Sequence, residues 1–223
     1  AVINDNVKPL PDSDKILHSF HMQAVNADKL YLPIKERQRV IGLKKHELLT
    51  DEIIIQPTDI AIRNNGIDID RDILKAAVFE RHHNTGHIGI GFVSGYGIKR
   101  GAIATSVAHD SHNLIAVGCS DEDIATAAEA VRKMGGGMVV VDQGTVIESL
   151  PLPIAGLMSD LSIEEVESRV NRLKEAATAL GASADIDPFM TLSFVSLPVI
   201  PVIRLNGKGL INVNRQEIVE ATF

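Results

Sequence analysis

Residues 114–141, LIAVGCSDEDIATAAEAVRKMGGGMVVV, decide the fold class of this chain. The two aliphatic ends of the stretch are typical of buried strands. Between them, Ser120 with Asp123 three residues later fits a helical capping box, and apolar residues recur at helical spacing as far as Met134. The glycine triplet that follows ends the helix. The order strand, helix, strand predicts a sheet with helices packed against it.

The C-terminal part of the sequence extends this pattern. Residues 138–150, MVVVDQGTVIESL, predict a β-hairpin, because a turn-forming Asp-Gln-Gly separates two aliphatic runs. A second capping box, Ser162 with Glu165, predicts a helix that Gly181 ends. The predicted inward-facing residues of this helix are Ile163, Val166, Val170, Leu173 and Ala177. Residues 187–205 carry three prolines among apolar residues, which predicts extended and buried chain.

The region before residue 114 contains aliphatic and glycine-rich stretches. Residues 40–43 and 53–55 predict paired strands, and the Asn-Gly step within 64–70 predicts a tight turn after them. Residues 72–81, DILKAAVFER, suit a helix or a strand, and we expect a strand towards their end. Residues 88–101 place five glycines among aliphatic residues. This favours close strand packing over phosphate binding, because no complete phosphate-loop motif is present.

Composition excludes several functional classes. The 223 residues, 45% hydrophobic, are enough for a sizeable core. A net charge of −7 and the absence of tryptophan argue against a nucleic-acid partner. The single cysteine cannot form an internal disulfide or a thiolate metal site. No apolar run reaches the roughly 18 residues of a membrane span, and no signal-peptide layout is present, so we expect no membrane association and a cytoplasmic location.

These patterns predict an α/β or α+β fold with layered mixed β-sheets, a few flanking helices and glycine-rich strands. Residues 1–35 mix proline, aspartate and asparagine without a sustained period, and we expect an irregular segment there. Residues 36–223 are expected to form one α/β domain, with at most a weak subdivision near residues 63–70.

The first candidate for chemistry is a histidine cluster in residues 80–89, ERHHNTGHIG. Imidazoles and carboxylates bind borderline divalent metals and also serve as acids and bases near neutral pH. Glu80, His82 and His83 are therefore candidate binding residues, with His87 close by. The alternative is that these are surface imidazoles beside Glu80.

The second cluster, residues 108–113 with the sequence AHDSHN, contains His109, Asp110, His112 and Asn113. Aliphatic stretches on both sides predict strand, loop, strand, which places the polar residues at a strand end, where α/β proteins often hold sites. Alternatively, Asp110 and Asn113 brace a turn while the histidines bond to the backbone. The sequence contains no H-E-x-x-H, H-x-H or G-x-S-x-G motif.

Four blocks of this sequence resemble one family. They are ERHHNTGHIGIGFVSGYGIKRGAIATSVAHDSHNLIAVG, MGGGMVVV, LPLPIAGLMSD and DPFMTLSFVSLPVIP. In this order they resemble the C-terminal region of bacterial and archaeal adenine deaminases, members of the amidohydrolase superfamily, from about Ile16 to the C-terminus. The resemblance implies hydrolysis of adenine to hypoxanthine and ammonia in purine salvage. Residues 36–223 then correspond to an adenine-deaminase-like C-terminal domain.

The resemblance also implies what lies outside this chain. Such enzymes hold a pair of divalent metals, often manganese or iron, in a (β/α)8 barrel that precedes this region, and nothing in these residues matches it. We therefore expect no barrel and no metal site within this chain, with the missing N-terminal barrel segment as its partner. A homo-oligomer is expected as well.

Three functions remain open for the candidate residues. In the first, His109, Asp110, His112 and Asn113 line the mouth of the active site, bind ring nitrogens of adenine or contact the barrel, and Glu80, His82 and His83 assist in binding substrate. In the second, the domain is a structural or oligomerisation module. In the third, the two histidine clusters and Glu80 bind one metal and form a self-contained metallohydrolase.

Overall fold

The computed structural model describes residues 13–223, which form a mixed β-sheet covered on both faces. The sheet strands are β1 (Gln38–Leu43), β2 (Thr50–Ile55), β3 (Leu74–Phe79), β4 (Ile88–Ser94), β5 (Ala102–Thr105), β6 (Leu114–Gly118), β7 (Gly137–Asp142) and β8 (Thr145–Pro151). They lie in the order β2-β1-β4-β3-β6-β5-β7-β8. β1 and β4 are parallel, and every other neighbouring pair is antiparallel.

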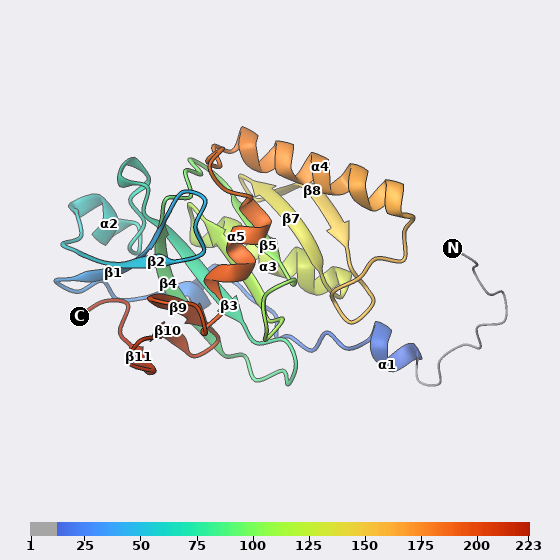
Figure 1. The fold of residues 1–223 in the computed structure, drawn as a ribbon, viewed down its shortest axis with the longest axis horizontal. Helices are drawn as coiled ribbons and strands as arrows, with labels where there is room; N and C mark the ends of the chain where they lie inside the picture. The colour runs from blue at the N-terminus through green and yellow to red at the C-terminus, as the bar shows by residue number, and fades with distance from the viewer. Residues whose placement is uncertain (1–12) are drawn as a thin grey trace.

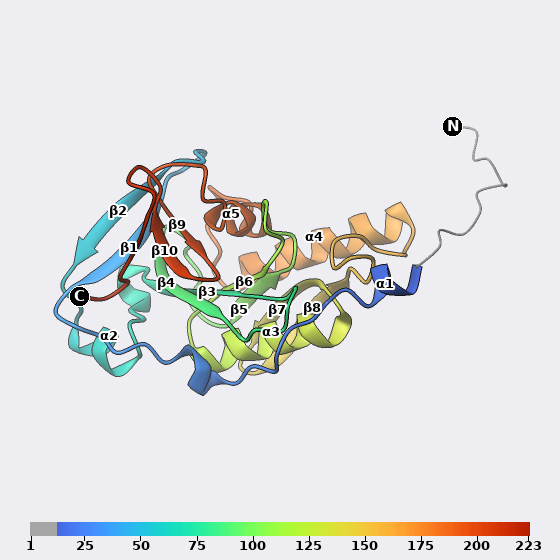
Figure 2. The same ribbon diagram turned by 90° about the horizontal axis from the view of Figure 1, so that it is seen from below.

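Helices and a second sheet form the outer layers. The helical elements are α1 (Ser13–Leu17), η1 (Ala27–Leu30), α2 (Asp59–Arg63), η2 (Ile69–Arg71), α3 (Asp121–Met134), α4 (Ile163–Ala179) and α5 (Pro188–Val195). The second sheet consists of β9 (Ile203–Asn206), β10 (Gly209–Asn212) and β11 (Glu217–Val219). Figure 2 shows α3 and η1 on one face of the main sheet, and α4, α5 and the second sheet on the other. The predicted layered α/β class is confirmed, and the described residues contain no (β/α)8 barrel.

The central strand β3 shows why the sheet residues are almost uniformly apolar. Leu74, Ala76 and Val78 belong to the core on the face covered by the second sheet, α4 and α5, whereas Ala77 and Phe79 belong to the core on the face covered by α3. Both faces of β3 are covered, and its residues are apolar except for the buried Lys75.

No helix within residues 13–223 combines the length and apolar character needed to cross a membrane.

The glycine-rich strand β4 allows the second sheet to pack directly on it. A Cβ atom added at Gly89 would lie 1.7 Å from the backbone oxygen of Asn206. A Cβ atom added at Gly91 would lie 2.8 Å from Leu210. The predicted use of these glycines in close strand packing is therefore confirmed at these two positions.

The helix predicted between Ser120 and the glycine triplet is α3. Ser120 Oγ accepts a hydrogen bond from the backbone N–H of Asp123 (3.1 Å), and Gly135 ends the helix in the left-handed conformation at φ 72°. A complete capping box would also have the Asp123 carboxylate accept from the backbone N–H of Ser120. Here the carboxylate accepts instead from the backbone N–H of Gly144 (2.7 Å). Asp123 thus links the helix to the predicted hairpin, which β7 and β8 form.

Ser162 caps helix α4, because its Oγ accepts a hydrogen bond from the backbone N–H of Glu165 (3.3 Å). Leu173 and Ala177 are buried as predicted, and Val166 and Val170 are partly buried against the same core. The prediction for Ile163 was wrong, because this side chain is 78% exposed. Ile163 is the first residue of α4, whose first turn extends beyond the strands that the helix covers (Figure 1).

The prediction of extended chain after residue 187 was also wrong, because residues 188–195 form the helix α5. Asp187 caps this helix by accepting from the backbone N–H groups of Phe189 (3.1 Å) and Met190 (3.0 Å). Pro188 occupies the first turn, where its fixed φ suits a helix and its missing N–H costs nothing. The proline therefore starts a helix here.

Replacing Asp187 with alanine is expected to lower the free energy of unfolding by about 1 kcal/mol, the usual value of a helix cap. The substitution also removes the ion pair between Asp187 and Lys174 Nζ (2.6 Å). Chemical denaturation of the two proteins measures the difference. The control is D160A, an exposed aspartate ahead of α4 with no hydrogen bond to a described residue, which should change stability by less than about 0.5 kcal/mol. Equal effects of D187A and D160A would contradict the assignment of the cap.

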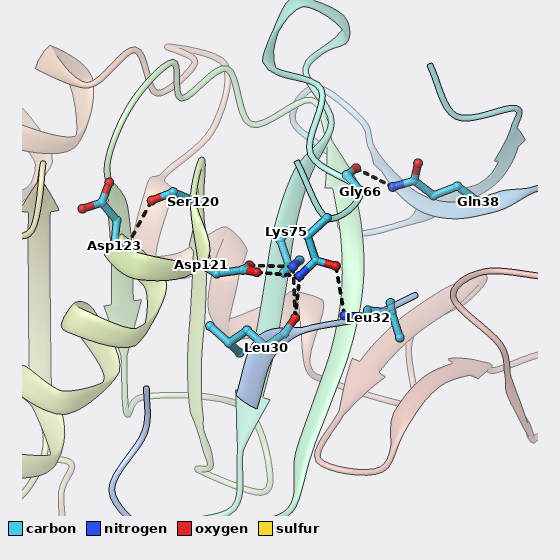
Figure 3. A network of polar contacts seen from close by, with 9 residues as sticks. Leu30, Leu32, Gln38, Gly66, Lys75, Ser120, Asp121 and Asp123 are labelled. Carbon is cyan, nitrogen blue, oxygen red and sulfur yellow. Dashed lines mark hydrogen bonds and ion pairs between the residues drawn. The ribbon is translucent and has the colours of Figure 1, made fainter. Parts of the chain in front are cut away.

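A buried polar network ties the N-terminal segment to the sheet (Figure 3). Lys75, fully buried on β3, donates from Nζ to Asp121 Oδ1 (2.5 Å) and to the backbone oxygen of Leu30 (3.0 Å). Asn65 Nδ2 donates to Asp121 Oδ2 (2.5 Å) and to the same Leu30 oxygen (3.1 Å), while its Oδ1 accepts from the backbone N–H of Leu32 (2.9 Å). Burial lowers the pKa of Lys75, although Asp121 opposes this effect. The network joins β3, α3, η1 and the predicted Asn-Gly turn, where Asn65 and Gly66 both have positive φ.

Candidate functional site

Three loops meet at one edge of the main sheet. Residues 80–87 join β3 to β4, residues 106–113 join β5 to β6, and residues 152–158 follow β8. The strands β3, β6 and β5 are consecutive antiparallel neighbours, so the loop after β3 and the loop after β5 emerge at the same edge (Figure 1). The two predicted histidine clusters are therefore adjacent, with His82 Nε2 2.7 Å from the backbone oxygen of Ser111.

Arg81 lies at the centre of this edge. Its side chain is buried, and its guanidinium donates to the backbone oxygens of His112 (Nε, 2.5 Å) and Ala155 (Nη2, 3.1 Å). Its backbone N–H donates to Asn113 Oδ1 (3.3 Å), and the Phe20 ring lies 4.9 Å from the guanidinium carbon. Burial lowers the pKa of Arg81 to about 10, and no carboxylate of residues 13–223 forms an ion pair with it.

Sequence reasoning did not select Arg81 as a site residue. An arginine after a glutamate at a strand end usually has its charge in water. The sequence offers one signal, because Arg81 follows the uninterrupted apolar run 76–79 and precedes the histidine pair. Its burial depends on Phe20 and residues 152–158, which are distant in sequence and could not be paired with it from spacing alone.

The loop 106–113 is anchored at two points. Ser106 Oγ donates to the backbone oxygen of Gly156 (2.6 Å) and accepts from the backbone N–H of Gly137 (2.8 Å). In the middle of the loop, His109 Nδ1 is hydrogen-bonded to Ser193 Oγ of α5, and the imidazole stacks on Phe194 at 4.8 Å between centroids. The predicted strand, loop, strand arrangement is confirmed.

His112 is half-buried at the point where the two histidine loops touch. Its backbone has φ 48°, its backbone N–H donates to Ala108 O (2.6 Å), and its Nδ1 is buried without a partner among the described residues. Burial lowers the pKa of His112, and the charges of Arg81 and His109 add to this effect while Asp110 opposes it. His112 is therefore a neutral imidazole near pH 7.

The remaining predicted residues of this loop differ in placement. Asn113 Oδ1 accepts from the backbone N–H of Arg81 and so joins the loop 106–113 to the loop 80–87. Asp110 is exposed and makes no hydrogen bond to a residue in the described range. The loop therefore presents one exposed carboxylate and the two imidazoles of His109 and His112.

The Glu80 carboxylate is bound by its own loop. Its Oε1 accepts from the backbone N–H groups of His82 (2.5 Å) and His83 (2.8 Å), and its Oε2 accepts from the N–H (3.1 Å) and hydroxyl (2.9 Å) of Thr85. Burial raises the pKa of Glu80, but these hydrogen bonds outweigh it and lower the pKa to about 2. His82 and His83 are left exposed at the loop tip, with ring centroids 6.3 Å apart.

Replacing Glu80 with glutamine is expected to destabilise the loop at neutral pH, because an amide nitrogen cannot accept the hydrogen bonds that one carboxylate oxygen accepts. The folded-state pKa of about 2 lies below the ordinary 4.5. The stabilisation is therefore complete above about pH 4.5 and is lost as pH falls towards 2. Denaturation curves of wild type and E80Q should converge over this interval. A pH-independent difference, or an equal effect of E47Q in the exposed β1–β2 loop, would contradict this role.

Hollows of different character lie near the loops. An open hollow of about 410 Å³ beside Arg81 is lined by Phe20, His21, Met22, His82, His83 and Asn84. A more apolar hollow of about 240 Å³ lies between the β1–β2 loop and α5, with Phe194 in its wall. Only the first borders both His82 and His83, so it is the one that belongs to the loop edge.

The possible metal ligands of the described residues are not brought together. Within residues 13–223, no group of three or more His, Cys, Asp or Glu side chains is placed to hold a metal ion. The two histidine loops touch, yet the imidazoles of His109 and His82 bond to Ser193 and to the Ser111 backbone, and the Glu80 carboxylate accepts hydrogen bonds from its own loop. The ligand set required by a self-contained metallohydrolase is therefore not assembled in this part of the chain.

The fold and the loop edge define a class of protein: a mixed α/β domain that presents imidazoles at the ends of its central strands and, in its described residues, has no barrel. The sequence profile described as "Adenine deaminase C-terminal domain" matches residues 47–217, and the chain belongs to this family.

Comparison with known proteins agrees with this assignment. The chain is 44% identical to adenine deaminase 2 of Carboxydothermus hydrogenoformans over 229 aligned residues, covering 100% of the chain and 40% of the relative. It is 43% identical to the adenine deaminase of Bacillus pumilus (93% of the chain, 36% of the relative). It is 50% identical to that of Methanothrix thermoacetophila (78% of the chain, 30% of the relative). The chain thus spans 30% to 40% of the length of these relatives.

Proposed function

We propose that this domain contributes to the hydrolytic deamination of adenine to hypoxanthine and ammonia as the C-terminal part of an adenine deaminase. The observation that carries the proposal is the family match, which covers residues 47–217 and therefore both histidine loops. The adjacency of these loops around the buried Arg81 supports a common role for them.

In this proposal the domain forms one wall of a shared site. His109, Asp110 and His112, with Asn113 bracing their loop, face the substrate or the segment that carries the chemistry, and His82 and His83 flank them. The neutral His112 suits hydrogen bonding to a ring nitrogen of adenine, because a neutral imidazole is both a donor and an acceptor. Glu80 acts indirectly, because its carboxylate accepts hydrogen bonds that fix the backbone carrying His82 and His83.

The divalent metals, manganese or iron, are proposed to be held by the part of the longer enzyme outside these residues, because no ligand group in the described range fits them. Residues 36–223 are proposed to act as one domain, since β1 pairs with β4 across the stretch 63–70. We further propose a cytoplasmic homo-oligomer that serves purine salvage.

A chimeric enzyme tests the function directly. In the Carboxydothermus hydrogenoformans relative, the aligned segment is replaced by this chain, and ammonia release from adenine is measured with Mn(II) or Fe(II). We expect an active chimera and no turnover by the chain alone. Turnover by the chain alone, or a chimera that assembles but is inactive, would contradict the proposal.

Substitution of His112 then tests the wall of the site. H112A in the chimera is expected to lower kcat/KM for adenine about tenfold or more, the effect of losing one hydrogen bond of roughly 1.4 kcal/mol. The control is H46A, an exposed imidazole in the β1–β2 loop. Gel filtration of both variants separates a role in turnover from a role in assembly. An unchanged kcat/KM for H112A would remove His112 from the site.

A further inference from the structure

The contact between His109 and α5 connects the loop 106–113 to the interior of the domain. Ser193 is 2% exposed, and its Oγ is hydrogen-bonded to His109 Nδ1. The stacked Phe194 ring lies nearly parallel to the imidazole, with 6° between the planes. Two neighbouring residues of one helix thus fix both the plane of this ring and one of its nitrogens.

The direction of this hydrogen bond follows from the surroundings of Ser193. Within residues 13–223, its hydroxyl has no hydrogen-bond partner other than His109 Nδ1. A buried hydroxyl proton without an acceptor is unfavourable, so the serine donates and Nδ1 accepts. A neutral imidazole that accepts at Nδ1 carries its proton on Nε2.

The second nitrogen of His109 is the one left available. Nε2 makes no hydrogen bond to a described residue, and the imidazole is partly exposed. The ring therefore offers an N–H donor outward, held in a fixed plane by Phe194.

We propose that Ser193 is a positioning residue that fixes His109 as the Nε2–H tautomer, and that this N–H donates to an acceptor nitrogen of the purine ring. The second half of this inference rests on the function proposed above. This donor suits adenine, because the unprotonated ring nitrogens of adenine are hydrogen-bond acceptors. Ser193 acts through His109 and does not touch the substrate.

Nitrogen NMR of the 223-residue chain labelled with ¹⁵N-histidine tests the tautomer, with H109Q assigning the signals of His109. We expect the neutral wild-type ring to be unprotonated at Nδ1 and protonated at Nε2, and S193A to shift this population towards the Nδ1–H form. The matched control is S196A, because Ser196 lies three residues further along, is 1% exposed and donates to Ser193 O (3.0 Å) without touching His109. A wild-type ring protonated at Nδ1, or an S193A spectrum equal to that of S196A, would overturn the role of Ser193.

Activity of the chimera tests the donor. The Gln amide N–H reaches a position similar to imidazole Nε2–H, so H109Q should retain about tenfold more kcat/KM than H109A. The kcat/KM of S193A should lie between those of wild type and H109A, and that of S196A should equal the wild-type value. Equal losses in H109Q and H109A would overturn the donor assignment. An inactive chimera would count against the proposed function, while the spectra would still decide the tautomer.

Discussion

Replacing Arg81 with alanine is expected to lower the free energy of unfolding by about 3 kcal/mol and to abolish most activity of the chimera. The guanidinium hydrogen-bonds the backbone oxygens of His112 and Ala155, which belong to different loops. Without it, both partly buried oxygens lose this donor and a void opens beside Phe20. The loop that carries His109 and His112 would then lose its support.

Chemical denaturation and ammonia release measure the two effects of R81A. Lysine at this position keeps the charge but not the planar fork, so R81K should recover part of the stability and less of the activity. The control is R100A, which removes a surface ion pair with Asp142 (3.0 Å, Arg100 side chain 52% exposed) and should cost less than about 1 kcal/mol. An R81A protein as stable as R100A would show that Arg81 does not hold the loops together.

The parts of the fold that sequence predicted are those specified by neighbouring residues. Ser120 and Gly135 bound α3, and each acts within a few residues of the helix end. The β7–β8 hairpin is likewise determined by a short turn. In the same helix, the partner of Asp123 could not be predicted, because Gly144 reaches it only after the hairpin has folded back.

Helix α5 shows how an apolar helix escapes detection. Its buried residues share one face, but the opposite face also carries apolar side chains such as Met190, which is 52% exposed, so the helix lacks the amphipathic period that identified α3 and α4. The nearby prolines are typical of extended chain and therefore led to the wrong prediction. The local signal for a helix was nevertheless present, because aspartate followed by proline is typical of a cap and a first helical residue.

The sequence identifies the two loops that carry the candidate residues, but it does not predict how these loops are arranged in space. Histidines, aspartate and asparagine identified both loops, because these side chains are rare among aliphatic stretches. That the two loops touch depends on β6 lying between β3 and β5, a long-range pairing that spacing does not specify. The same limit applies to Ser193, whose link to His109 spans 84 residues of sequence.

Replacing Asp121 with alanine is expected to lower the free energy of unfolding by about 3–5 kcal/mol, the usual result of leaving a buried charge unpaired. The Lys75 side chain is 0% exposed, and without Asp121 its ammonium group keeps, among residues 13–223, only the Leu30 oxygen as acceptor. Asn65 loses one of its two acceptors as well. Burial already lowers the pKa of Lys75, and the loss of Asp121 lowers it further. The D121A deficit should therefore shrink as pH rises, because the folded state releases the lysine proton before the unfolded state does.

A double-mutant cycle separates the ion pair from simple loss of packing. K75M fills a similar volume without charge, so K75M/D121A should be more stable than D121A alone, since no unpaired charge remains. The surface control D142A removes the carboxylate partner of Arg100 and should cost less than about 1 kcal/mol, with little pH dependence between neutral and mildly alkaline solution. If the losses of K75M and D121A simply add, the two groups are not coupled, and the attachment of the N-terminal segment to the sheet depends on Asn65 and Leu30 instead.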